Sequence, residues 1–202
     1  MTVETNIRGE IFTYKVLWDC CLAQLQTAKR RKTQTQSFYI SAMLMGYLTY
    51  EAYINFLGDR FAPDIWAQER EFFNGKEYRG TQGKLKYLSE RIPIKGIIAG
   101  QRPVQSIQKL KKLRDFLSHG RVDKYKKTIK HKRDNDPPLF GQYGTIDKLV
   151  TPELAEIAIV DVKAFMEFLH SQARNHTEDM WFGKDPWDDF IAHAMSDSKT
   201  LA

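Results

Sequence analysis

Three residues near the middle of the chain, Arg114, Asp115 and His119, have types and a spacing that could do chemistry together. They stand in the segment LRDFLSHG, which follows a run of lysines. Arginine carries a permanent planar cation with five donors, which suits a phosphate group. Histidine changes its charge near neutral pH, so it can transfer a proton. A phosphate binder and a proton-transfer group are a minimal set for metal-free cleavage of RNA, in which the 2′-hydroxyl attacks the adjacent phosphate.

The spacing alone does not decide between a site and an ordinary helix end. Residues five apart on a helix point about 140° away from each other, so Arg114 and His119 do not share one face. Gly120 suits the left-handed position after a helix, so His119 is expected in the last turn, where the helix dipole favours a cation. The alternative is a surface arginine and a capping histidine.

Other chemistries find little support in the sequence. There is no glycine-rich phosphate loop and no GxSxG motif. The histidines provide no pair at metal-ligand spacing with a third ligand nearby, so His170 and His176 are predicted to be structural or surface residues. No metal and no cofactor is expected. Cys20 and Cys21 are adjacent and do not suit a disulfide, which fits a reducing compartment.

The elements that position these residues are predicted to be helices. Apolar residues at three- and four-residue steps predict a first helix over Glu4–Arg31. A second helix is predicted to begin near Thr35 or Ser37 and to end at Gly58. It is apolar almost all round, so it is expected at the centre of the fold. Its most apolar part, Tyr39–Leu57, also holds charged and polar residues and is therefore predicted to be a core helix, not a membrane span.

The rest of the chain also favours helices. We expect a short helix and a turn in Phe61–Gly83, a helix over Lys84–Ile92, and the motif helix from Val104 to His119. Thr151 as N-cap and Pro152 at the first position predict a long final helix. No strand is expected. The fold class is therefore all-α, a bundle of four to five main helices with a basic loop at 121–150 and a C-terminal tail at 176–202 that adds at most a short helix over Asp185–Met195.

Positive charge is concentrated in one part of the chain. The whole protein carries +6, whereas residues 109–133 hold eleven Lys or Arg against two Asp, a net charge of +9. Such a local excess favours contact with a nucleic-acid backbone, and the alternative is a solvated charged loop. The first ten residues lack the pattern of a signal peptide, so a cytoplasmic location without membrane attachment is expected.

The segment IQKLKKLRDFLSHGR resembles the RxxxxH helix of the HEPN superfamily, the higher-eukaryote and prokaryote nucleotide-binding domains. Arg114, Asp115, His119 and Gly120 match the family pattern of arginine, a polar residue, histidine and often glycine. A long apolar helix with a central acid precedes the motif in LTYEAYINFL, and a long helix follows it. The resemblance covers residues 4–175, which makes 1–175 the expected HEPN-like domain. Asp115 departs from the more common asparagine.

The resemblance implies a helical homodimer in which the motif helices of two subunits form one shared cleft. It also implies a metal-independent endoribonuclease of the toxin–antitoxin, abortive-infection or antiviral-defence type, with RNA as substrate and an antitoxin or other defence protein as a further partner. Arg114 would bind the scissile phosphate, His119 would transfer the proton and Asp115 would orient one of them. Backbone contacts to RNA are expected from six basic residues: Lys111, Lys112, Arg121, Lys124, Lys126 and Lys127.

Two further residues are candidates for support of this site, Glu51 and Ser118. An unpaired carboxylate among apolar residues is costly, so Glu51 either pairs with Arg114 or another cation, or is exposed or otherwise satisfied. Two functions other than cleavage remain open. One is a non-catalytic HEPN-fold module that binds RNA or nucleotides or dimerises. The other is a structural helical protein that recruits a partner through its basic face.

Overall fold

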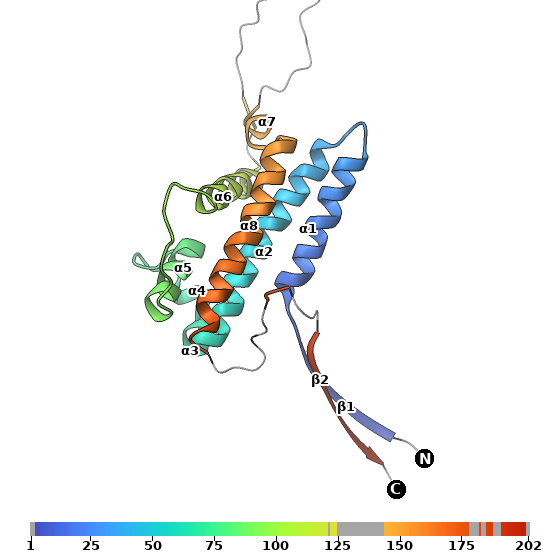
Figure 1. The fold of residues 1–202 in the computed structure, drawn as a ribbon, viewed down its shortest axis with the longest axis vertical. Coiled ribbons are helices and arrows are strands. Elements are labelled where there is room, and N and C mark those ends of the chain that lie inside the picture. The colour runs from blue at the N-terminus through green and yellow to red at the C-terminus, as the bar shows by residue number, and fades with distance from the viewer. Residues whose placement is uncertain are drawn as a thin grey trace, which may run out of the picture.

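Three long helices lie side by side and form the body of the molecule in this computed structural model (Figure 1). They are α1 (Thr13–Arg30), α2 (Gln36–Phe61) and α8 (Pro152–Arg174). The structure describes residues 3–120, 122–124, 144–177, 182, 185–187 and 191–200 of the 202-residue chain, the backbone alone for 3–10 and 191–200. The predicted all-α class is confirmed for this body.

Helix α2 is the central element, as its apolar composition predicts. It contacts α1, α8 and the smaller helices that follow it in the chain. Its fully buried side chains include Tyr47, Tyr53, Ile54 and Leu57, which pack in the core with Met166 and other residues of α8. Within the described part of the chain, no helix is long and apolar enough to cross a membrane.

The predicted end of α2 at Gly58 is wrong, because the helix continues to Phe61. Gly58 is buried, and a Cβ placed on it would come within 1.8 Å of Cε2 of Trp66. The glycine is therefore required by the close approach of the Trp66 indole and not by a left-handed turn.

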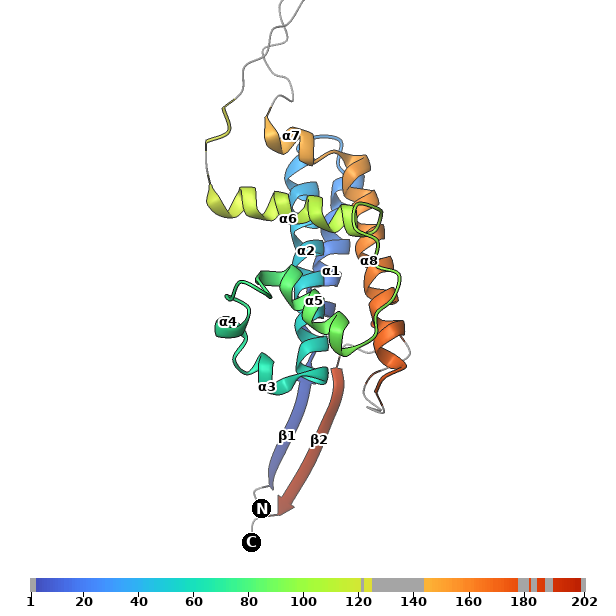
Figure 2. The same cartoon turned by 90° about the vertical axis from the view of Figure 1, so that its left-hand side faces the viewer.

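Five shorter helices complete the bundle among the described residues: α3 (Pro63–Trp66), α4 (Glu69–Phe72), α5 (Gly80–Arg91), α6 (Val104–His119) and α7 (Thr145–Leu149). Helix α6 runs across the long helices and contacts both α2 and α8 (Figure 2). The motif helix thus has its predicted bounds. Helix α5 begins at Gly80, four residues before the predicted Lys84, because its two glycines resemble a loop in sequence.

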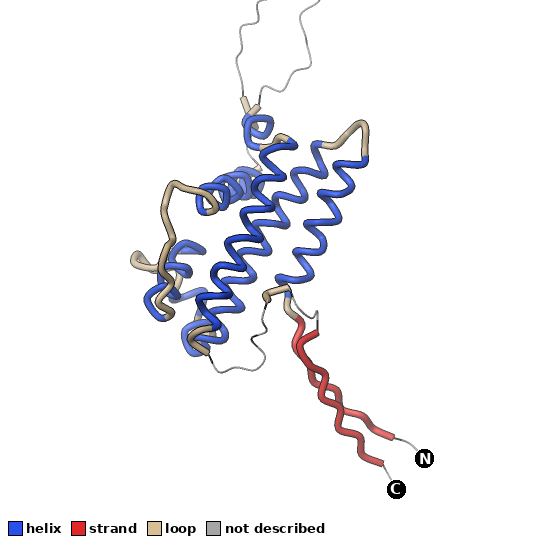
Figure 3. Tube along the Cα trace, viewed as in Figure 1, coloured by secondary structure: helices blue, strands red, loops and turns tan. Residues whose placement is uncertain are grey.

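The two ends of the chain form a pair of strands that the sequence analysis missed (Figure 3). Strand β1 (Val3–Ile11) pairs antiparallel with β2 (Ile191–Thr200), so that Val3 lies opposite Thr200. The first helix therefore begins at Thr13 and not at Glu4. The short helix expected over Asp185–Met195 is wrong for its last five residues, which belong to β2.

The final helix begins as predicted. The Thr151 hydroxyl oxygen accepts a hydrogen bond from the Leu154 backbone N–H at 3.2 Å, and Pro152 occupies the first helical position. Near the end of α8, His170 is buried and its Nδ1 lies 3.0 Å from the Tyr53 hydroxyl. The structural assignment of His170 is confirmed, while His176 is exposed.

Candidate functional site

Helix α6 is fixed by its apolar face and ends cleanly after His119. Ile107, Leu110 and Leu113 are buried against the other helices. Gly120 has a φ of 53°, the left-handed conformation predicted for it, and its N–H donates to the Leu117 carbonyl at 3.2 Å. The apolar face therefore packs α6 against α2 and α8 as far as Leu113.

Arg114 is bound to Glu51, which confirms the alternative in which these two residues pair. Nη2 of Arg114 lies 2.9 Å from Oε1 of Glu51. The same carboxylate oxygen accepts a hydrogen bond from the Thr81 hydroxyl at 2.5 Å. One carboxylate thus joins three helices, α2, α5 and α6, at the position of the arginine.

The second terminal nitrogen of Arg114 contacts its neighbour in sequence. Nη1 lies 2.9 Å from Oδ1 of Asp115, and the other oxygen of Asp115 accepts from Lys111 at 2.5 Å. The hydrogen bond from Lys111 holds the pKa of the Asp115 carboxyl below its ordinary value. Asp115 therefore stays ionised at neutral pH and orients the guanidinium of Arg114. The ammonium group of Lys111 is bound to Asp115 and is not available as a separate phosphate contact.

The aromatic ring of Tyr47 lies beneath the guanidinium, with the Arg114 Cζ 5.2 Å from the ring centroid. A cation over an aromatic face is attracted by the electrons of the ring. Burial of Arg114 lowers its pKa, but Glu51, Tyr47 and Asp115 together outweigh this effect, so the pKa lies above its ordinary value. Burial raises the pKa of the Tyr47 hydroxyl to about 12. The arginine is thus a fixed cation with a neutral ring below it.

His119 is exposed and lies one helical turn beyond Asp115 on the same side of α6. Among the described contacts none joins His119 to Arg114. Because α6 is regular up to His119, the angle of about 140° between the two positions persists within one chain. A single protomer therefore does not bring the arginine and the histidine together.

The remaining predicted residues fall into two groups. Lys112, Ser118 and Lys124 are exposed at or after the C-terminal half of α6, where they can meet a ligand. Three other predicted RNA contacts lie outside the described residues: Arg121, Lys126 and Lys127.

Two residues of the cluster were missed by the sequence analysis, Tyr47 and Thr81. Tyr47 stands four residues before Glu51, so the i, i+4 rule for helix neighbours could have found it. Thr81 comes from a different helix, and no signal in the sequence relates it to Glu51. We call Tyr47, Glu51, Thr81, Arg114 and Asp115 the arginine cluster.

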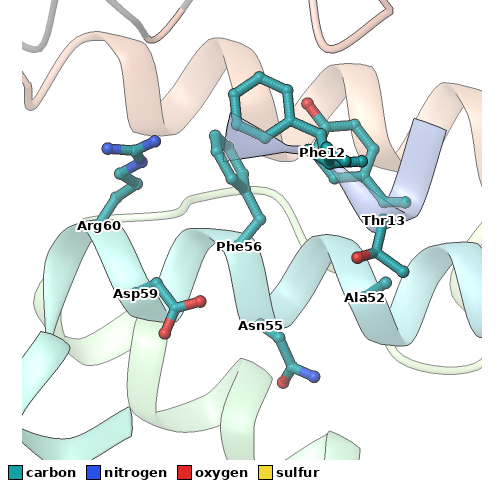
Figure 4. A pocket seen from close by; sticks show the side chains of 9 residues that line it. Phe12, Thr13, Ala52, Asn55, Phe56, Asp59 and Arg60 are labelled. Carbon is teal, nitrogen blue, oxygen red and sulfur yellow. The ribbon is translucent and has the colours of Figure 1, made fainter. Parts of the chain in front are cut away.

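A cavity of about 570 Å³ lies elsewhere, at the N-terminal end of α1 (Figure 4). The rings of Phe12 and Phe56 lie on one side of it, and the side chains of Asn55 and Asp59 point to the other. No residue of α6 lines this cavity, so it is not part of the arginine cluster. Within the described residues, no three His, Cys, Asp or Glu side chains are grouped so that they could hold a metal ion.

Comparison with known proteins does not assign the chain to a family. No family model matches the chain, and neither a curated protein nor a solved structure matches it.

Proposed function

We propose that this protein is a metal-independent endoribonuclease of the HEPN type that acts in microbial defence or as a toxin. The observation that carries this proposal is the arginine cluster beside an exposed histidine. Arg114 is held at both terminal nitrogens and stays charged; its Nε is buried, while the side chain as a whole is 31% exposed. Such an oriented cation can stabilise negative charge that builds up on a phosphate oxygen.

The reaction needs only groups of the chain and of the RNA. A base removes the proton of the 2′-hydroxyl, whose oxygen attacks the adjacent phosphorus. The 5′-oxygen of the next nucleotide leaves with a proton, which yields a 2′,3′-cyclic phosphate and a 5′-hydroxyl. His119 transfers a proton in this reaction, and such a group raises the rate roughly 10²–10⁴-fold. Asp115 orients Arg114, and Lys112 of α6 with the lysines of the following loop binds the flanking backbone.

The angle between Arg114 and His119 favours a site that is shared with a second copy of the chain. In a homodimer with two-fold symmetry, each α6 faces its counterpart, and the arginine of one protomer can work with the histidine of the other. We propose this homodimer as the active form in the cytoplasm, with an antitoxin or another defence protein as its regulator.

A second candidate function is a non-catalytic HEPN-fold module that binds RNA or nucleotides or dimerises. One observation favours it: both terminal nitrogens of Arg114 already contact carboxylates, so the arginine also serves to join α6 to α2. In this case Arg114 is a structural residue and His119 a helix-capping residue.

Cleavage of RNA in excess EDTA distinguishes the two functions. The wild type is expected to produce fragments that end in 2′,3′-cyclic phosphate, whereas Arg114→Lys and His119→Ala are not. His176→Ala is the matched control, because His176 is an exposed histidine beyond the end of α8. Circular dichroism checks that each variant is folded. Absence of cleavage by the wild type on total RNA contradicts the proposal, and equal cleavage by all variants places the activity outside these residues.

A further inference from the structure

Four consecutive cations at the end of α1 and in the turn that follows it have no role in the proposed site. Lys29, Arg30, Arg31 and Lys32, which we call the basic turn, are all exposed. Cations in the last turn of a helix are stabilising, and this accounts for Lys29 and Arg30. Arg31 and Lys32 lie beyond the end of α1, so stabilisation of the helix dipole does not explain why these positions are basic.

Two side chains of the basic turn, Lys29 and Arg31, contact other residues of the chain. Lys29 lies 3.2 Å from Glu156, but both side chains are about half exposed, so the pair contributes little. The guanidinium of Arg31 stacks on the ring of Phe38 with 4.7 Å between its Cζ and the ring centroid. Stacking fixes the direction of an arginine and leaves its donors available for a phosphate.

The basic turn and α7 lie at the same end of the long helices, and α6 crosses these helices near that end, on the side away from α1 (Figures 1 and 2). Gln36, at the start of α2, donates to Asp147 of α7 at 2.7 Å. Thr145 of α7 donates to Asp123, its hydroxyl at 2.9 Å and its backbone N–H to the other oxygen. Four steps of chain separate Asp123 from His119, a path of at most roughly 14 Å. A chain of contacts thus links the α1–α2 turn to the proposed site.

Three acidic side chains at this end are occupied by other groups, and Glu153 in the first turn of α8 is exposed. Asp123 binds α7, Asp147 accepts from the Gly144 N–H at 2.9 Å and from Gln36, and Glu156 pairs with Lys29. Lys148 of α7 and Lys124, which follows Asp123 in the chain, are exposed as well. Repulsion among these cations is relieved when they bind a polyanion.

We propose that the basic turn, with Lys124 and Lys148, is a second contact surface for the RNA backbone. It extends the site on α6 across the end of the bundle, so the substrate is an RNA long enough to reach both. The inference rests on the proposed function for its choice of RNA as the polyanion. The basic turn contributes to binding and not to the chemical step.

Salt dependence of RNA binding tests this surface directly. The probe is a fluorescent single-stranded RNA, and the parent protein is His119→Ala, which leaves the probe intact. The slope of log K against log salt falls by about 0.7 for each phosphate contact that is lost. We expect Arg30→Gln/Lys32→Gln to make the slope shallower by about 1.4. The matched control is Arg70→Gln/Lys76→Gln, which neutralises two exposed cations of α4 and the turn after it.

The outcomes separate this inference from the proposed function. A slope that equals that of the control overturns the basic turn as an RNA contact, even if the wild type cleaves RNA. A shallower slope in the basic-turn variant supports it, even if the wild type proves inactive in cleavage. Vesicles that contain anionic lipid are measured in parallel. If the basic-turn variant loses vesicle binding and keeps its RNA binding, the surface serves a membrane and the inference is wrong.

Discussion

At the scale of single residues, the arginine cluster is the most informative feature of the protein. Its members could be predicted in part. For the mid-helix carboxylate of Glu51, a cation partner was one of two expected outcomes, and Glu51 does pair with Arg114. The hydroxyl of Thr81 and the ring of Tyr47 complete the cluster, and these contacts depend on how α5 and α2 meet α6 in space. Local sequence patterns do not contain that information.

Glu51 is expected to position Arg114 for catalysis. Glu51→Gln removes the charge that holds the guanidinium and should lower kcat for RNA cleavage by about 10- to 100-fold, because small displacements of a positioned group are costly. The same change should destabilise the fold by only about 1 kcal/mol, since both side chains are partly exposed. Kinetics and urea denaturation measure the two effects.

Glu71→Gln, on the exposed side of α4, is the control for this substitution. Thr81→Val should act in the same direction as Glu51→Gln but more weakly, because Glu51 keeps its contact with Arg114. A rise in cleavage on Glu51→Gln would mean that the carboxylate withholds the arginine from the substrate, the opposite of a positioning role.

At the scale of elements, the ends of helices show what local patterns can and cannot predict. Gly120 was assigned correctly, because a glycine after a helical run has a local reason to adopt positive φ. Gly58 resembles it in sequence but lies inside α2, where Trp66 packs against it. The role of Gly58 depends on a tertiary contact with Trp66, so the sequence alone could not distinguish it from Gly120.

The missed strands have a different cause. In β1 the residues Val3, Thr5 and Ile7 alternate with Glu4 and Asn6, a period of two that is typical of a strand. The spacing of Ile7 and Ile11 also fits a helix, and α1 follows directly. The partner strand lies at the other end of the chain, at 191–200, so nothing nearby in sequence favours one period over the other.

The two glycines of α2 provide a prediction about stability. Gly58→Ala should destabilise the protein by about 1–3 kcal/mol or more, because its Cβ would overlap the indole of Trp66 at 1.8 Å. Gly46→Ala is the control on the same helix, since its Cβ would meet Cys21 Sγ at 3.5 Å, an ordinary contact. Alanine favours a helix over glycine by about 1 kcal/mol, so Gly46→Ala should be neutral or stabilising in urea denaturation. Equal effects of both changes would contradict the packing role of Gly58.

At the scale of the whole molecule, the bundle explains how one helix can present both a fixed cation and a free histidine. Helix α6 is buried along Leu110 and Leu113, which binds it to α2 and α8. Arg114 lies at the edge of this buried face, where α2 supplies Glu51 and Tyr47. His119 extends past that edge into solvent. The two groups therefore differ in environment on the same short segment, one restrained by the core and one available to a partner protomer.

The proposed homodimer predicts complementation between two inactive variants. Arg114→Lys lacks the guanidinium and His119→Ala lacks the proton-transfer group, so each homodimer should be inactive. A mixed dimer contains one intact arginine and one intact histidine on opposite protomers, the arrangement of the proposed shared site. Mixing the two variants after mild unfolding and refolding should therefore restore part of the cleavage activity.

Two controls decide whether restored activity comes from a shared site. Each variant refolded alone must remain inactive, and a mixture of His119→Ala with the double variant Arg114→Lys/His119→Ala must remain inactive as well, since it contains no histidine at position 119. Light scattering establishes that the proteins are dimers under the assay conditions. If the mixture of single variants stays inactive while the wild type cleaves RNA as a dimer, the arginine and histidine of opposite protomers do not work together.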